Sequence, residues 1–270
     1  MSYTELVQSL HENIDLCCIK STDNDHRWHL GASMIGEECR RKLWYSFRWC
    51  FKEKITGRMA RIFDRGHREE TRFIWWLEGG SCEVRREAHK EAFRGHFGGT
   101  PDAVVFLPKN YGFNVPLLAE FKTHKDNAEF KKLVKEGVKT TKPLHWAQMC
   151  VYGHLTGLNH ALYMVVNKNT DELHIEVLEL DLEHGKAMIE KGGQIIFSEE
   201  PPVRASDLSV HQKCVLCAAR GICHYNEPLE LNCRSCKHAT PFDDGSWMCA
   251  QKTIDPQNVY DVCDHYFSIK

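Results

Sequence analysis

Apolar and polar residues follow one another along this chain in patterns that predict both strands and helices. Two apolar runs, at residues 103–106 and 115–121, flank a Pro-Lys-Asn-Tyr-Gly segment and predict a β-hairpin. Two further strands are expected at residues 160–168 and 172–180, joined by an Asn-Thr-Asp turn. Apolar residues spaced three and four apart predict amphipathic helices over residues 2–16, 57–78 and 182–197.

Other helices are indicated by their capping residues. Ser33 is the expected N-cap of a basic, aromatic helix that carries Cys39 near its start. Pro143 is expected in the first turn of another helix, and residues 127–138 fit either a helix or a mobile basic loop. Gly66 lies inside the 57–78 helix, where glycine costs about 1 kcal/mol relative to alanine. We therefore expect the backbone at Gly66 to be approached closely by another group.

Composition places the chain among ordinary globular proteins. Its 270 residues are 42% hydrophobic and 27% charged, which allows one large domain or a domain with an appendage. The first residues do not resemble a signal peptide, and no apolar run is long enough to span a membrane. The expected compartment is the cytoplasm, where thiols stay reduced, so the 13 cysteines favour metal or cluster binding over disulfides.

The net charge of −2 gives no sign of nucleic-acid binding, but the basic residues are unevenly distributed. Residues 40–94 are rich in arginine and lysine, and the first of these alternate with aromatic residues from Trp44 to Phe51. One interpretation is a groove that tracks phosphates and stacks bases. The other is a helix with its aromatic residues in the core and its arginines in solvent.

The predicted hairpin carries the candidate chemistry. Glu120 and Lys122 are two apart on one strand and share a face, and Asp102 begins the paired strand. With the backbone carbonyl of Phe121, they supply oxygen ligands of the kind that Mg²⁺ and Mn²⁺ prefer, beside one amine. The alternative is a Glu-Lys pair on the solvated face of an ordinary strand.

Three other residues are candidates by position. Glu70 follows Gly66 by four residues, and it either faces the site or forms a surface ion pair with Arg65 or Arg72. Gln148 and Tyr152 are four residues apart and share one face of the helix that begins at Pro143.

Four motifs in this order, G-x-x-x-E, GGTPD, EFK and QMCVY, resemble the RecB-like branch of the PD-(D/E)XK nuclease superfamily. The resemblance covers roughly residues 30–225 and is nearest to phage recombination exonucleases. It implies an α/β nuclease core, with a mixed central sheet flanked by helices. A small cysteine-rich, metal-binding region would follow at the C-terminus.

The resemblance also implies roles. Asp102 and Glu120 would hold Mg²⁺ or Mn²⁺ together with the Phe121 carbonyl, and Lys122 would orient the attacking water. Glu70 would bind the metal directly or through water, although several relatives use a histidine, so His67 is an alternative. Gln148 and Tyr152 would position the DNA strand or the lysine.

The implied activity is that of a metal-dependent deoxyribonuclease. The family suggests an exonuclease acting on DNA in phage or bacterial recombination or end processing, with a phage annealing or recombination protein as a partner. If the chain is phage-encoded, its location would be the cytoplasm of the bacterial host. One alternative is a structure-specific endonuclease with the same site. Another is a module on the nuclease fold that binds DNA or a protein partner without cutting.

The cysteines near the C-terminus form two groups. The first contains Cys214, Cys217 and Cys223, and three thiolates need a fourth ligand. Related AddB-type and CRISPR-associated nucleases hold a [4Fe-4S] cluster with one upstream cysteine and three downstream, which implies Cys39 as the fourth ligand. The alternatives are zinc at these cysteines, or a histidine, His211 or His224, in place of Cys39.

The second group contains Cys233, Cys236, Cys249 and Cys263. Its paired C-x-x-C followed by two spaced cysteines predicts a structural zinc site of the ribbon type, in which His265 could replace Cys263. These features divide the chain into a nuclease domain over residues 1–227, closed by a cysteine-ligated cluster, and a zinc-ribbon-like appendage over residues 228–270. A segment of this length is expected to need a metal because it is too short for a core of its own.

Overall fold

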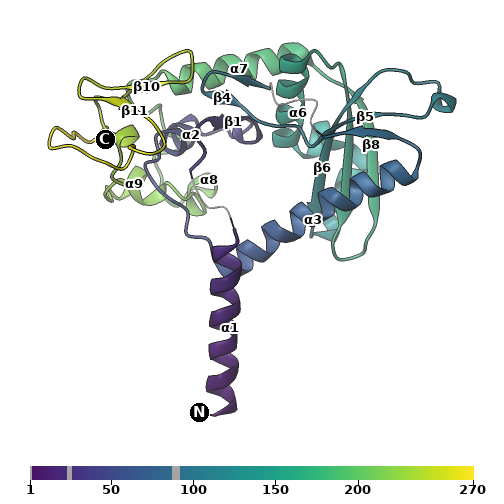
Figure 1. Ribbon diagram of the computed structural model, residues 1–270, viewed down its shortest axis with the longest axis horizontal. Coiled ribbons are helices and arrows are strands. Elements are labelled where there is room, and N and C mark those ends of the chain that lie inside the picture. The colour runs from purple at the N-terminus through teal and green to yellow at the C-terminus, as the bar shows by residue number, and fades with distance from the viewer. Residues whose placement is uncertain (1, 23–25, 87–91) are drawn as a thin grey trace.

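The computed structural model of the protein describes residues 2–22, 26–86 and 92–270 (Figure 1). Its α-helices are α1 (Tyr3–Lys20), α2 (Arg40–Phe47), α3 (Gly57–Gly79), α4 (Asn127–Glu136), α5 (Val138–Thr141), α6 (Pro143–Thr156), α7 (Leu182–Ile196), α8 (Gln212–Val215) and α9 (Arg220–His224). Its longer strands are β5 (Ala103–Phe106), β6 (Leu117–His124), β7 (His160–Asn167) and β8 (Leu173–Glu179). Shorter strands are β1 (Leu30–Gly31), β2 (Glu83–Arg85), β3 (Phe93–Arg94), β4 (Phe97–Gly98), β9 (Thr240–Pro241), β10 (Trp247–Met248) and β11 (Thr253–Ile254).

In the described residues the largest sheet is mixed and has five strands, in the order β2-β5-β6-β7-β8. Strands β5 and β6 form the predicted antiparallel hairpin, with Ala103 opposite Ala119, and Gly112 turns the loop at φ 69°. Strands β6 and β7 are parallel because a helical crossover, α4 to α6, connects them. Strand β8 returns antiparallel to β7. The predicted strands and the mixed α/β fold are therefore confirmed.

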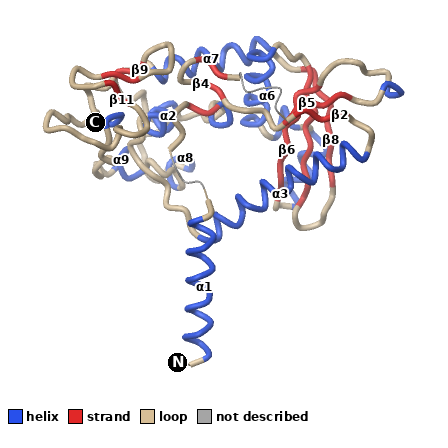
Figure 2. The backbone as a smooth tube through the Cα atoms, viewed as in Figure 1, coloured by secondary structure: helices blue, strands red, loops and turns tan. Residues whose placement is uncertain are grey.

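Helices cover both faces of this sheet (Figure 2). On one face, Phe73 and Ile74 of α3 pack with Phe121 and Met164, and the rings of Phe73 and Phe121 stack at 5.2 Å. On the other face, α6 packs on residues such as Leu118 and Tyr163, in a core cluster that continues into α2 and α7. The middle strand β6 is therefore buried on both sides, and its polar residues are forced into the interior.

The predicted helices at residues 57–78 and 182–197 and the helix that begins at Pro143 are confirmed, and residues 127–136 form α4 rather than a loop. Two details are wrong. A 3₁₀ turn occupies Ala32–Met34, and α2 begins only after Cys39, so Ser33 is not its N-cap. The chain turns before α2, where Gly36 packs against Leu144 of α6. At Gly66, a Cβ atom would meet no described atom within 4 Å outside the helix's own backbone, so the close approach expected there is absent from the described chain.

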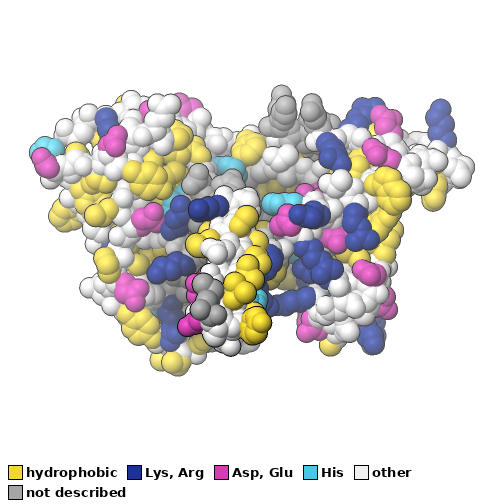
Figure 3. Space-filling view, turned by 60° about the horizontal axis from the view of Figure 1, so that its bottom comes forward, with side chains coloured by type: hydrophobic (Ala, Val, Ile, Leu, Met, Phe, Trp, Pro, Cys, Tyr) yellow, Lys and Arg dark blue, Asp and Glu magenta, His cyan; other side chains and the backbone are white. Residues whose placement is uncertain are grey.

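Helix α1 projects away from the body (Figure 1) and buries none of its residues. It is joined to α3 at its base, where Arg61 pairs with Asp15 at 2.5 Å. Figure 3 looks toward the tip of this helix and shows a hydrophobic stripe along it, with lysine and arginine side chains on either side of its base. In the described residues, no helix is long and apolar enough to cross a membrane.

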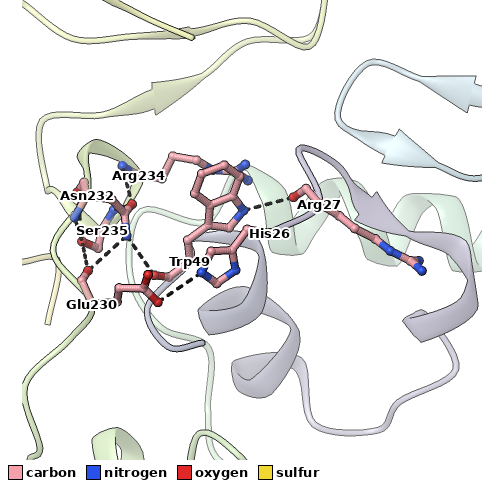
Figure 4. Close-up of polar contacts among 7 residues, drawn as sticks. All are labelled: His26, Arg27, Trp49, Glu230, Asn232, Arg234 and Ser235. Atoms are coloured by element: carbon pink, nitrogen blue, oxygen red, sulfur yellow. Dashed lines mark hydrogen bonds and ion pairs between the residues drawn. The ribbon is translucent and has the colours of Figure 1, made fainter. Parts of the chain in front are cut away.

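The C-terminal segment 228–270 packs directly on the N-terminal part of the chain. Its apolar side chains, such as Trp247 and Val259, belong to the same core cluster as those of α2. Figure 4 shows the polar contacts that accompany this packing. Asn232 donates to the carbonyl of Trp49 at 2.9 Å, and His26 contacts Glu230 at 3.1 Å.

Arg234 is the centre of this junction. Its guanidinium is fully buried and lies within about 5 Å of four aromatic rings, those of Trp28, Phe47, Trp49 and Trp247. It donates to the carbonyls of Phe47 and Trp28. Such a planar cation on aromatic faces is a stabilising arrangement that lysine cannot reproduce. Residues 228–270 therefore share an apolar core with the N-terminal part of the chain.

Candidate active site

Asp102 and Phe121 meet at the open end of the β5–β6 hairpin. Strand β5 begins after Asp102, and in the described residues no strand pairs with this edge of β6 beyond Ala119. The backbone N–H of Phe121 donates to Oδ2 of Asp102 at 2.6 Å. Because the N–H and C=O of one strand residue point to the same side, the Phe121 carbonyl also faces the side of Asp102. Burial raises the pKa of Asp102, against the opposing effect of the Lys122 ammonium.

Glu120 and Lys122 share a face of β6 and form an ion pair through Oε1 of Glu120. Glu120 is completely buried, and its Oε2 has no hydrogen-bond partner in the described residues. Burial, together with the nearby carboxylate of Asp102, raises the pKa of Glu120 to about 7 despite the opposing effect of Lys122. Burial disfavours the charge on Lys122, but the carboxylates of Glu120 and Asp102 outweigh it and raise the lysine pKa to about 12. The alternative prediction, in which Glu120 and Lys122 form a pair on the solvated face of an ordinary strand, is therefore wrong.

Helix α3 carries the third carboxylate. Burial and the neighbouring Asp102 raise the pKa of Glu70, while His67 and Lys122 lower it. Glu70 thus belongs electrostatically to the hairpin site. The surface ion pairs considered for it are made by the preceding residue, because Glu69 pairs with Arg72 at 2.9 Å and with Arg65 at 4.0 Å. His67 is exposed but close enough to affect Glu70.

Gln148 and Tyr152 lie on the buried face of α6 that points toward the site. Burial raises the pKa of Tyr152 to about 12, with contributions from Glu120 and Asp102. A Cβ atom at Gly99 would overlap the Tyr152 hydroxyl, so a larger residue there would have to displace the tyrosine side chain. The second glycine of GGTPD therefore leaves room for the tyrosine.

His145 and Tyr163 were not singled out from the sequence. Tyr163 is the register partner of Glu120 on β7, and its hydroxyl lies 3.0 Å from Nδ1 of His145 in the first turn of α6. Burial and Lys122 lower the pKa of His145 to about 3, which keeps the imidazole neutral. The sequence does contain a pattern that points to His145. It precedes Gln148 by three residues and Tyr152 by seven, so the three residues share one face of the helix.

The residues fit a hard cation by charge and donor type. Asp102 raises the pKa values of both Glu70 and Glu120, and the buried Oε2 of Glu120 lacks a hydrogen-bond donor in the described chain. As they stand, however, no three His, Cys, Asp or Glu side chains of the described residues converge closely enough to hold a metal ion.

The stretch rich in arginine and lysine, residues 40–94, divides into two parts. The aromatic residues Trp44, Tyr45, Phe47 and Trp49 are buried, so the base-stacking interpretation is wrong for them. The arginines of α3 are exposed and recur every three or four residues, which places them along one side of the helix at Arg58, Arg61, Arg65, Arg68 and Arg72. Residues 87–91 of this stretch lie outside the described ranges.

The two cysteine groups each line one cavity. Cys39, Cys214, Cys217 and Cys223 line a cavity together with Lys42 and His224, whereas His211 is not among its lining residues. Cys233, Cys236, Cys249 and Cys263 line a second cavity with His238 and His265. All 13 cysteines are free thiols. Neither group is drawn together tightly enough in the described chain to form a closed ligand set.

No family model matches the chain, and no curated protein matches its sequence. Among solved structures, that of SSO0001 matches at 12% identity and a TM-score of 0.45, covering 81% of this chain and 96% of that one. An alkaline exonuclease, LHK-Exo from Laribacter hongkongensis, matches at 14% identity and a TM-score of 0.43, over 63% of this chain and 87% of that one. The structure of LHK-Exo in complex with dAMP matches at 14% identity and a TM-score of 0.45, covering 62% of this chain and 86% of that one. These similarities are too low to assign a family or a reaction.

Proposed function

We propose that the protein is a divalent-metal-dependent deoxyribonuclease that hydrolyses phosphodiester bonds at the β5–β6 hairpin. The observation that carries this proposal is the buried Glu120, whose Oε2 lacks a partner in the described chain while Asp102, Glu70 and Lys122 all act on its charge. Buried carboxylates that are crowded together are costly to a fold and typical of functional sites. Their oxygen donors suit Mg²⁺ or Mn²⁺.

Each residue has a role in this proposal. Asp102, Glu120 and the Phe121 carbonyl would hold the cation, with Glu70 as a further ligand, direct or through water. A bound divalent ion lowers the pKa of water and neutralises charge on phosphoryl oxygens. Lys122 stays protonated and can donate to the attacking water or to a phosphate oxygen. Tyr152 also stays protonated, and with Gln148 it can donate to the lysine-carboxylate cluster or to DNA.

DNA as the substrate is supported by the row of arginines on α3. The row runs along α3, the helix that also carries Glu70 on another of its faces, and arginines contact phosphates through paired N–H donors. Part of its charge is already compensated, since Arg61, Arg68 and Arg72 pair with Asp15, Asp64 and Glu69. An exonuclease in recombination or end processing, with a phage annealing or recombination partner, is the form of this function that the sequence resemblance favours.

The decisive experiment compares degradation of linear and circular DNA with Mg²⁺, with Mn²⁺ and with chelator. We expect cutting of linear DNA that requires the metal and falls at least about 100-fold in Glu120→Gln and Lys122→Met. Glu70→Gln should lose activity, whereas Glu78→Gln is the control, because Glu78 is exposed in the last turn of the same helix. Circular dichroism would verify folding.

Three results would redirect the proposal. DNA degradation at the parent rate by Glu120→Gln and Lys122→Met would overturn the site. DNA binding without cutting, in any metal, would favour the non-cutting module. Equal cutting of circular and linear DNA would favour an endonuclease.

The proposal includes a [4Fe-4S] cluster at Cys39, Cys214, Cys217 and Cys223. Its support is that these four thiols, which come from segments far apart in the sequence, line one cavity. Burial raises the pKa of Cys217, and the neighbouring Lys42 ammonium opposes this and favours the thiolate.

Anaerobic purification with iron, sulfide and zinc analysis tests the cluster. We expect iron and sulfide, lost in Cys214→Ser but retained in Cys150→Ser, whose thiol is buried elsewhere in α6. Zinc without iron or sulfide would establish the alternative.

The proposal assigns Zn²⁺ to Cys233, Cys236, Cys249 and either Cys263 or His265, in the appendage over residues 228–270. Its support is the shared cavity, in which both candidate fourth ligands take part. Metal analysis of Cys263→Ser and His265→Ala would separate the two. We expect zinc loss in only one of them. Full zinc in Cys236→Ser would contradict the site.

A further inference from the structure

Strand β8 forms one edge of the five-stranded sheet, and in the described residues no other strand pairs with its outer side. Asn167 N–H donates to the Glu172 carbonyl and Leu180 N–H to the Asn159 carbonyl, so the even-numbered residues of β8 direct their backbone groups to β7. The odd-numbered residues, Leu173, Ile175 and Val177, therefore direct theirs away from the sheet.

The same three residues are apolar and half-exposed. Leu173, Ile175 and Val177 are 45%, 48% and 49% exposed and lie on one face of the strand. Their register partners on β7, Val166, Met164 and Leu162, are buried in the core on that face. The apolar face of the sheet is therefore buried at β7 but exposed to solvent at β8.

Strand β8 lacks a proline, a lysine and a bulge at this edge, and its partly buried polar pair, His174 and Glu176, lies on the face opposite Leu173, Ile175 and Val177. Natural edge strands are commonly protected by proline, lysine, a bulge or an inward charge. Residues 173–179 read LHIEVLE, with neither proline nor lysine, and pair with β7 in an unbroken register. A regular strand with free backbone groups and an apolar face is suited to accept another strand.

We infer that β8 pairs with β8 of a second copy of this chain, antiparallel and centred on Ile175. This register places Ile175 opposite itself and Leu173 opposite Val177. All three are then hydrogen-bonded pairs, because these are the residues whose backbone groups point outward. The apolar side chains pack across the junction, which joins two sheets into one.

Charge complementarity favours the second copy as the occupant. In this register His174 of one copy lies opposite Glu176 of the other, in a non-hydrogen-bonded pair where side chains are closest. Within one chain, His174 contacts Glu176 at 2.7 Å, and the Val138 N–H donates to Glu176 at 3.0 Å. Both side chains are thus held at the edge, and the dimer brings the two His174–Glu176 contacts together into one cluster of four residues.

The pairing has a consequence for the two sites. Strand β6 is two strands from β8 in each copy, so the two β6 strands would lie five strand spacings apart, roughly 24 Å. The dimer would carry two copies of the hairpin site on one continuous sheet.

Light scattering after size-exclusion chromatography measures the mass of the parent and of Ile175→Lys. We expect a dimer for the parent and a monomer for the variant, because two ammonium groups would meet at the twofold axis. Leu10→Lys is the matched control. Leu10 is 53% exposed on the apolar stripe of α1, and this variant should remain a dimer. Circular dichroism would verify that both variants fold.

The register is tested by oxidation of single-cysteine additions. Hydrogen-bonded antiparallel pairs have Cα atoms about 5.5 Å apart, within disulfide range. Ile175→Cys should therefore link to itself, identified by mass spectrometry of the 175–175 peptide. Leu173→Cys should not, because its two copies would be roughly 14 Å apart along the strands, but it should link to Val177→Cys when the two are mixed. A monomeric parent, a dimeric Ile175→Lys, or a Leu173 self-link in place of the Ile175 link would overturn the inference.

Discussion

Asp102 accepts the backbone N–H of Phe121 at 2.6 Å, and this bond joins the start of β5 to the uncovered edge of β6. It satisfies a backbone donor that the sheet leaves unpaired, and it fixes one carboxylate beside the Glu120–Lys122 pair. One side chain thus serves the fold and the candidate site together.

Substitutions at Asp102 should separate these two contributions. Asp102→Asn keeps an oxygen for the Phe121 N–H but removes the charge, so we expect a folded protein without metal-dependent cutting. Asp102→Ala leaves the N–H unpaired and should lower the free energy of unfolding by about a further 1–3 kcal/mol. Urea denaturation of both variants measures the difference. Equal stability of the two would show that the hydrogen bond is energetically unimportant.

Gly99 and Gly66 should respond oppositely to alanine. Gly99→Ala forces a methyl group into the Tyr152 hydroxyl and should destabilise the protein by about 1–3 kcal/mol. Gly66→Ala enters open space within α3 and should stabilise it by up to about 1 kcal/mol. Thermal unfolding measures both.

The Gly99 effect should depend on Tyr152. In Tyr152→Phe the hydroxyl is absent, so Gly99→Ala should cost less in that background than in the parent. A double-mutant cycle gives the coupling. Additive effects would mean that the hydroxyl is not the group displaced.

Binding of Mg²⁺ or Mn²⁺ should depend on pH through Glu120. The carboxyl has its pKa raised to about 7, so below that pH it holds a proton that a cation must displace. We expect the affinity to rise as pH increases through about 7 and to level off above it. Titration calorimetry in two buffers of different ionisation enthalpy would detect the released proton. Affinity that does not change across this range would argue against Glu120 as a ligand.

Acid should destabilise the junction between β4 and the C-terminal segment through His96. Burial lowers its pKa to about 4, its Nε2 donates to the Ser246 carbonyl at 3.0 Å, and its Nδ1 has no partner in the described chain. The unfolded chain therefore binds the proton first as pH falls below the ordinary value of 6.5. The stability is fully present above that value and is lost toward pH 4, by at most about 3 kcal/mol.

The control for this effect is a histidine in solvent. His96→Gln keeps a donor for Ser246 and should flatten the pH dependence of the unfolding free energy, while His11→Gln on exposed α1 should leave it unchanged. Equal slopes in all three proteins would assign the acid sensitivity to other groups.

Arg234→Lys should be strongly destabilising although it keeps the charge. The ammonium cannot lie flat among four rings and reach the carbonyls of Phe47 and Trp28 together. We expect a loss of about 2–5 kcal/mol from unpaired carbonyls and lost contacts. The exposed Arg58→Lys is the comparison, with no measurable loss in urea denaturation. A tolerated Arg234→Lys would mean that charge alone holds the junction.

Local patterns in the amino-acid sequence were sufficient to locate the periodic elements. Alternation and turn residues located the β5–β6 hairpin and strands β7 and β8. Apolar spacing located α3 and α7, and Pro143 located the start of α6, because each of these patterns depends on local geometry. The same reasoning put Glu120 and Lys122 on one face, since residues two apart in a strand must share one. The start of α2 was wrong because the packing of Gly36 on α6 overrides the capping signal at Ser33.

How distant segments meet is a property of the tertiary fold alone. The parallel register of β6 and β7 brings Tyr163, and through it His145, next to Glu120. The buried Arg234 joins the C-terminal segment to α2, and the end of the sheet leaves β8 uncovered in the described chain. These relationships connect residues far apart in the chain, and local periodicity carries no information about which elements become neighbours.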